Sequence, residues 1–344
     1  SFQPTSEFSR VTRMYFTLLD ILRFLSAIAV LFHHTFIFHY GKLGVYLFFI
    51  ISGFVIYFSL NKGLKEYAIG RFLRLYPLFW ICLTLTYLTT LFYGNNLPLD
   101  RYLIGLAMFN DGKIAQMVDG SAWTLTFELL FYFYIAIFVK LFSTKKLEWF
   151  YISWLTISFL GFFLQVDQHV VLKLLSIRFA PYFVFGGMLA LLIDRYTIIT
   201  LKTKILYFGT LLAAALLPLY ISAKLRAQTG SITNFTGSFE PDEMLIVESF
   251  FLLIPLAVYF SYYPFAKAKS FSKICLMLGG ITYPLYLLHW KIGETVISAN
   301  GYIYGEVTYF SIGVAILITL ISYVLSVYDI TLRKYLKKIF FSGN

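Results

Sequence analysis

The chain carries little charge. Of its 344 residues only 13% are Asp, Glu, Lys or Arg, whereas 59% are hydrophobic and 20% are aromatic. Average soluble domains contain about 25% charged residues, so the composition excludes an ordinary soluble domain. Apolar runs recur along the whole length, which favours many membrane spans over a soluble domain with one anchor. The composition therefore predicts an all-α integral membrane protein.

Several kinds of chemistry lack the residues that they need. Cys82 and Cys275 lie in apolar runs and indicate no disulfide framework. No Cys/His spacing and no His-Glu-x-x-His motif suits a metal ion, and no glycine loop ends in Gly-Lys-Ser or Gly-Lys-Thr. The net charge of +11 is not gathered in a basic domain or helix that would hold a nucleic acid. We therefore expect no metal, no nucleic-acid partner and no nucleotide-driven pumping.

Apolar runs of about 20 residues predict ten transmembrane helices. They lie near 16–39, 43–60, 75–93, 122–141, 148–165, 174–193, 205–222, 244–263, 275–292 and 307–328. Nineteen of the 28 Lys and Arg residues then fall on the side of the two termini, which the positive-inside rule makes cytoplasmic. We interpret 1–344 as one membrane domain, with an N-terminal tail at 1–14 and a cytoplasmic C-terminal tail at 329–344.

The first predicted helix contains polar residues that a lipid-facing helix would not tolerate cheaply. Eleven helical steps of about 100° separate Arg23 from His34, so their side chains project within roughly 20° of each other, about 16 Å apart along the axis. His33 lies about 80° away from that line. Polar groups within a membrane are functional candidates, although a structural arginine and a hydrogen-bonded core histidine explain this stripe about equally well.

Other spans carry further candidates. Arg71 and Arg74 lie three residues apart on one helix face, where they would either bind an anionic ligand or anchor to lipid headgroups. Glu128 is a carboxylate in the outer leaflet and needs either a partner from another helix or a raised pKa. The topology places it at a depth similar to that of His34. His289 beside Trp290 is either functional or part of an interfacial aromatic belt.

Two pairs of small residues predict close helix packing. Ser52-Gly53 lies within the second span and Gly186-Gly187 within the sixth. Small side chains allow two helix backbones to approach each other.

Six blocks of residues, taken together, resemble a known family. They are Leu19–Arg23 followed by His34, Phe48-Phe49 with Ser52-Gly53-Phe54, Arg71 with Arg74, Tyr76-Pro77, Trp123 with Glu128, and Tyr283–His289. In this order and over almost the whole chain they resemble the acyltransferase-3 family of membrane O-acyltransferases. The resemblance implies a ten-helix domain that moves an acyl group, usually acetyl from acetyl-CoA, onto a hydroxyl of a surface carbohydrate, lipid or other small acceptor.

The resemblance also implies roles for individual residues. The essential histidine of the family corresponds to His34, its preceding arginine to Arg23, and its arginine pair to Arg71 and Arg74. We expect the arginine pair to hold the nucleotide end of acetyl-CoA and Arg23 to hold the pantetheine arm or stabilise developing charge. His34 would act as general base with Glu128 as its orienting partner, or it would carry a transient acetyl group.

The chain also departs from some relatives of this family. A C-terminal esterase-like domain occurs in some of them, and we interpret this chain as a standalone form. Tyr328–Leu332 matches the closing pattern of the family only loosely and receives no role.

Two other functions fit buried charges in a ten-helix bundle. A glycan or lipid-linked sugar transporter or flippase would use a polar path equally well, and a non-catalytic receptor would leave Arg71 and Arg74 without a task. For the acyltransferase interpretation we expect membrane lipids, an acyl-CoA donor and a carbohydrate or lipid-linked glycan acceptor as partners, with a homo-oligomer left open. The expected location is the inner (plasma) membrane of a bacterium.

Overall fold

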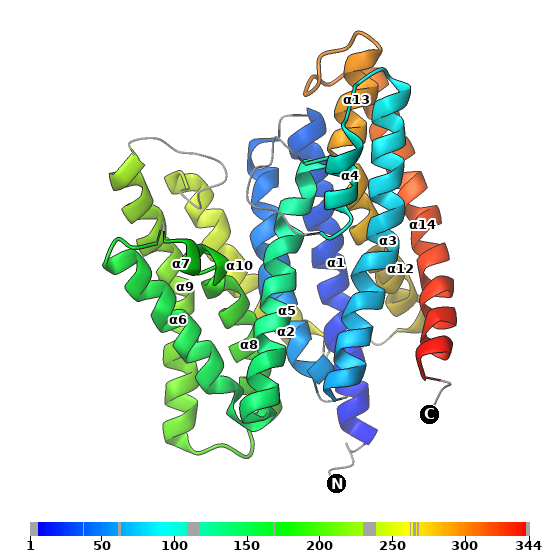
Figure 1. Ribbon diagram of the computed structural model, residues 1–344. Helices are drawn as coiled ribbons and strands as arrows, with labels where there is room; N and C mark the ends of the chain where they lie inside the picture. The colour runs from blue at the N-terminus through cyan, green and yellow to red at the C-terminus, as the bar shows by residue number, and fades with distance from the viewer. Residues whose placement is uncertain are drawn as a thin grey trace. The chain divides into compact units, whose positions relative to one another are not determined.

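The computed structural model describes residues 6–36, 38–60, 63–108, 117–167, 169–229, 239–261, 263, 266 and 268–341. A helix occupies each of the ten predicted spans (Figure 1). These are α1 (Ser6–Phe36), α2 (Gly44–Leu60), α3 (Leu64–Phe92), α5 (Trp123–Phe142), α6 (Leu147–Phe163), α8 (Ala180–Arg195), α9 (Leu201–Thr229), α10 (Pro241–Phe260), α12 (Lys269–Leu288) and α14 (Tyr309–Phe341). The all-α polytopic membrane fold is therefore confirmed.

Eight helical segments among the described residues are long and apolar enough to cross a membrane. The other two predicted spans correspond to α6, with 17 residues, and α8, with 16. The number of ten spans and the side on which the termini lie stay predictions. Four prolines lie inside helices, namely Pro77, Pro218, Pro255 and Pro284. Membrane helices tolerate proline where neighbouring groups satisfy the freed backbone carbonyls.

Several helices extend beyond the predicted spans, among them α1, α3 and α14. Helix α1 begins at Ser6, within the predicted N-terminal tail, and α14 continues to Phe341, so most of the predicted C-terminal tail is helical. Helix α3 begins at Leu64, eleven residues before the predicted start at 75. Charged residues near the helix ends hid these extensions, because apolar runs reveal only the part of a helix that lies in lipid.

Short helices lie in the connections. They are η1 (His39–Leu43), α4 (Leu99–Gly105), η3 (Gly120–Ala122), η4 (Thr144–Lys146), α7 (Val170–Leu174) and α13 (Lys291–Ala299).

The chain forms two compact units, each assembled from three separate segments. Unit 1 contains 1–19, 46–64 and 127–267, and unit 2 contains 20–45, 65–126 and 268–344. Since neither unit is one continuous stretch, the division marks no linker in the sequence, and the single membrane domain stays a prediction.

In unit 1, α2 and α8 cross closely where the small residues were found. A Cβ on Gly53 would lie 2.1 Å from the carbonyl oxygen of Phe183, and one on Gly186 would lie 1.9 Å from that of Ile50. Both distances are far below van der Waals contact, so only glycine allows this crossing. The predicted close packing at these residues is confirmed.

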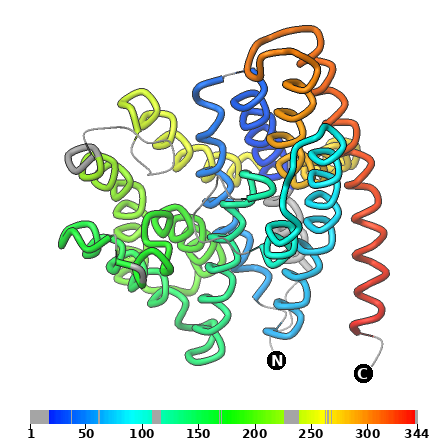
Figure 2. Tube along the Cα trace, turned by 45° about the horizontal axis from the view of Figure 1, so that its top comes forward, coloured from blue at the N-terminus to red at the C-terminus, as the bar shows by residue number. Residues whose placement is uncertain are grey.

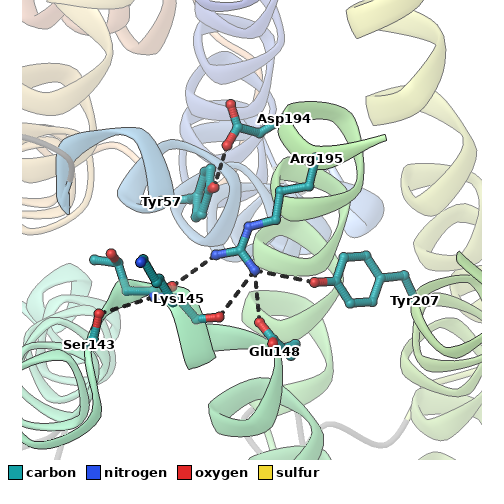
Figure 3. A network of polar contacts seen from close by, with 8 residues as sticks. Tyr57, Ser143, Lys145, Glu148, Asp194, Arg195 and Tyr207 are labelled. Carbon is teal, nitrogen blue, oxygen red and sulfur yellow. Dashed lines mark hydrogen bonds and ion pairs between the residues drawn. The ribbon is translucent and has the colours of Figure 1, made fainter. Parts of the chain in front are cut away.

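Arg195, at the end of α8, forms hydrogen bonds with the turn between α5 and α6 (Figure 3). Its guanidinium donates to the backbone oxygen of Thr144 at 2.9 Å and forms an ion pair with Glu148 at 3.0 Å. The neighbouring residue Asp194 accepts a hydrogen bond of 2.6 Å from the Tyr57 hydroxyl of α2. These contacts tie four helices of unit 1 together at one end.

In unit 2, the last three helices lie side by side in both views of the chain (Figure 1 and Figure 2). Helix α12 packs along α14, and α13 packs against both. Helix α12 also reaches α3, because the Tyr283 hydroxyl donates to the backbone oxygen of Leu75 at 3.1 Å. Unit 2 thus combines the Asp20–Phe36 part of α1 with elements from distant parts of the sequence.

Candidate active site

His34 lies in a cluster of aromatic rings at the end of α1. Its ring stacks on the indole of Trp290, with centroids 4.1 Å apart and planes inclined by 22°. The His289 ring lies 5.1 Å away and the His33 ring 4.9 Å away, centroid to centroid. Within the described part of the chain, neither ring nitrogen of His34 has a hydrogen-bond partner. The imidazole is therefore positioned by its contacts with three other rings.

The His289 ring is held in one tautomer. Its Nδ1 lies 2.7 Å from the backbone oxygen of Tyr286, and since a carbonyl only accepts, Nδ1 carries the hydrogen. In the neutral ring, Nε2 then bears a lone pair, and this buried atom has no hydrogen-bond partner among the described residues. The Tyr286 hydroxyl is itself fixed by Thr124 at 2.9 Å. A buried hydrogen-bond acceptor thus lies beside His34.

The segment before α5 packs against Trp290. A Cβ on Gly120 would lie 2.7 Å from Cζ3 of the indole, so the ring rests on glycine backbone. Asp119 caps the short helix η3 (Gly120–Ala122), because its carboxylate accepts a 2.8 Å hydrogen bond from the Ser121 backbone N–H. Burial raises the pKa of Asp119 to about 6, although the hydrogen bond from Ser121 and the charge of Lys291 both act to lower the pKa.

Arg23 lies on α1 about three helical turns before His34. It is 9% exposed and pairs with Asp20 across one helical turn at 3.4 Å. The positive charge of Arg74 on α3 also acts on Asp20. The structure therefore places Arg23 and Arg74, both predicted to bind the acyl donor, near the same carboxylate.

Helices α1 and α12 touch near both ends of this stripe. The carboxylate of Asp20 faces Gly279, where a Cβ would lie 2.6 Å from its Cγ. Ten residues later, about 15 Å along α12, His289 meets His34. The arginines and the histidine cluster thus lie about 15 Å apart along one helix pair in unit 2.

Glu128 belongs to unit 1 and has the interhelical partner that a carboxylate in a span requires. Its Oε1 accepts a 2.9 Å hydrogen bond from the Ser52 hydroxyl of α2 and a second one from the Tyr132 hydroxyl, one turn along α5. His34 belongs to unit 2. The pairing of Glu128 with His34 stays a prediction.

Sequence reasoning assigned no role to Trp290 and left His289 undecided. Both belong to one block with Tyr283 and Tyr286, and aromatic residues near a helix end are typical of an interfacial belt as well. The signal that distinguishes the two interpretations is spatial, because only the fold reveals that this block contacts His34.

Comparison with known proteins identifies the family. Neither the curated proteins nor the solved structures gave a match to this chain. The family model described as an acyltransferase domain matches residues 16–328, which include Arg23, His34 and His289. The chain therefore belongs to the acyltransferase-3 family and is a membrane acyltransferase.

Proposed function

We propose that the protein transfers acetyl from acetyl-CoA to a hydroxyl of a cell-surface carbohydrate, with His34 as general base. Acetyl-CoA would enter from the cytoplasmic side of a bacterial inner membrane, and the acceptor would be an O-antigen, exopolysaccharide or similar glycan. The family supports acyl transfer; the donor, the acceptor and the residue roles are the proposal.

One observation carries this assignment. The helix that carries buried Arg23 also carries His34, about 16 Å further along, and neither ring nitrogen of His34 has a hydrogen-bond partner within the described residues. Arginine forks suit phosphates, and the pantetheine arm of CoA is long enough to separate its phosphates from its thioester. Donor recognition and chemistry can therefore lie at opposite ends of one stripe.

The proposed reaction needs one base and no added reagent. His34 takes the proton of the acceptor hydroxyl while the hydroxyl oxygen attacks the thioester carbonyl. The tetrahedral intermediate then releases CoA thiolate. The thiolate takes the proton back from the imidazolium, so His34 ends neutral. His289 is a positioning residue whose Nε2 accepts a hydrogen bond from protonated His34. Glu128 keeps its predicted orienting role.

The test uses purified, membrane-reconstituted protein, acetyl-CoA and a crude acceptor glycan, with released CoA thiol as the readout. His34→Ala is expected to lower kcat by about 100-fold or more, the range in which general-base catalysis contributes. His33→Ala is the matched control, since it removes a neighbouring imidazole and is expected to retain activity.

The same preparation separates the two forms of the mechanism. Direct transfer predicts no acetylated protein when the acceptor is omitted, whereas an acetyl-histidine would add the mass of one acetyl group to a peptide containing His34. A folded His34→Ala variant with wild-type activity would show that the assignment of His34 is wrong.

A further inference from the structure

The last helix carries an ion pair between Asp329, in the segment that was assigned no role, and Arg333, just after it. Arg333 Nη2 lies 2.5 Å from Asp329 Oδ2, one turn back on α14. The Asp329 side chain is 6% exposed and that of Arg333 is 30% exposed. Arg333 Nε and Asp329 Oδ1 are buried and have no hydrogen-bond partner among the described residues. The pair is thus partly buried and keeps unused hydrogen-bonding capacity.

One turn of α12 contacts both α14 near Asp329 and the helices α1 and α3, which carry Arg23 and Arg74. Three contacts fall within five residues of α12. Gly279 faces the Asp20 carboxylate of α1, and a Cβ added to Gly280 would lie 3.7 Å from the Cβ of Ser326 on α14. The Tyr283 hydroxyl donates to the backbone oxygen of Leu75 on α3. Arg74 directly precedes Leu75, and Asp329 follows Ser326 by about one turn. The three helices therefore present Arg74, Asp329 and Asp20 around the same turn of α12.

The electrostatics agree with this placement. Both Arg71 and Arg74 act on Arg333 with their positive charges, and Arg74 also acts on Asp329. With Arg23 and Asp20, four guanidinium groups and two carboxylates gather in this arginine cluster, which carries a net charge of +2. Like charges held together in a partly buried site repel each other unless an anion joins them.

An ordinary helical ion pair does not explain this arrangement. A pair at i and i+4 needs only one arginine, and the positive charges of Arg71 and Arg74 repel Arg333. A phosphate ligand does benefit, because each guanidinium offers a fork of parallel N–H donors that matches phosphate oxygens.

We propose that Arg333 is a third arginine of the donor site and binds a phosphate group of acyl-CoA together with Arg71 and Arg74. Asp329 holds the Arg333 fork toward the site before the donor arrives. This inference rests on the proposed acyl-CoA donor and adds to its site a residue of α14 that lies in the predicted C-terminal tail.

The experiment measures equilibrium binding of CoA, the product, by calorimetry with the full chain in lipid-free detergent, so that no catalysis is required. Arg333→Ala is expected to weaken CoA binding by about 10- to 100-fold, as loss of a hydrogen bond to a charged group predicts. Arg333→Lys keeps the charge but not the fork, and is expected to give an intermediate loss. Lys334→Ala removes the adjacent exposed charge and is expected to bind as the wild type does.

The outcomes separate the inference from the proposed function. If Arg71→Ala loses CoA while Arg333→Ala and Arg333→Lys both keep wild-type affinity, Arg333 serves a lipid headgroup or the helix alone, and the inference is wrong. If the folded wild-type protein does not bind CoA, the donor assignment itself is wrong. In acetyl transfer, Arg333→Lys is expected to raise the KM for acetyl-CoA and leave kcat near the wild-type value.

Discussion

Replacing Gly120 by alanine is expected to disturb His34 through Trp290. The added Cβ would lie 2.7, 2.9 and 3.1 Å from three carbons of the indole ring, whereas carbon atoms in contact are about 3.5–4.0 Å apart. The ring must therefore move by about 1 Å, and it is the ring on which His34 stacks at 4.1 Å. Gly120 does not have a positive φ, so the backbone accepts alanine without strain.

A misplacement of about 1 Å in a catalytic group can cost about 100-fold in rate, so we expect kcat to fall by about 10- to 100-fold. The KM for acetyl-CoA is expected to stay unchanged, because the arginines lie near Gly279 of α12, about 15 Å along the helix from the histidine cluster. The assay is CoA thiol release from reconstituted protein. Gly209→Ala is the control, since an added Cβ there meets no atom within 4 Å.

A double-mutant cycle tests whether the effect passes through the indole. If Gly120→Ala acts only by moving Trp290, combining it with Trp290→Ala should reduce kcat no further than Trp290→Ala alone. Independent, multiplying losses would refute this reasoning, and so would a folded Gly120→Ala variant with wild-type kcat.

Two further predictions concern the same end of unit 2. Burial raises the pKa of Asp119 from 3.8 to about 6, so its ionisation opposes folding: the cost is absent below pH 4, grows as the pH rises and is complete above about pH 6. At about 1.4 kcal/mol per pH unit, the cost reaches roughly 3 kcal/mol. Asp119→Asn, whose amide oxygen can still accept from Ser121, should unfold at a higher temperature than the wild type at pH 8 but not at pH 4; the same difference at both pH values would contradict this account. His289→Gln removes the imidazole acceptor beside His34 and should lower kcat about ten-fold or more with little change in the KM for acetyl-CoA; an unchanged kcat would show that His289 is structural.

The helices of the fold could be predicted from the sequence because lipid imposes a length and an apolar composition on each helix that crosses it. The close crossing at Gly53 and Gly186 was predictable for a related reason, since small residues in a span serve close packing. The helical period also gave the stripe of Arg23 and His34, because both residues lie on one helix.

Contacts between distant segments could not be predicted in this way. Trp290 reaches His34 across more than 250 residues of chain, and its position next to an interfacial tyrosine block indicated a lipid belt equally well. Arg333 lies beyond the last apolar run, where the sequence predicted a tail, and only the packing of α14 on α12 brings it near Arg74. Periodicity describes one helix at a time, whereas a site depends on which helices become neighbours.

The most direct test of the central claim is mass spectrometry of cell-surface carbohydrate from cells that produce this protein. Cells with the wild-type chain should carry glycans heavier by one acetyl group than cells without it, and His34→Ala at equal membrane abundance should abolish that gain. Glycans that gain no acetyl group with the wild-type chain, or gain it equally with His34→Ala, would contradict the account.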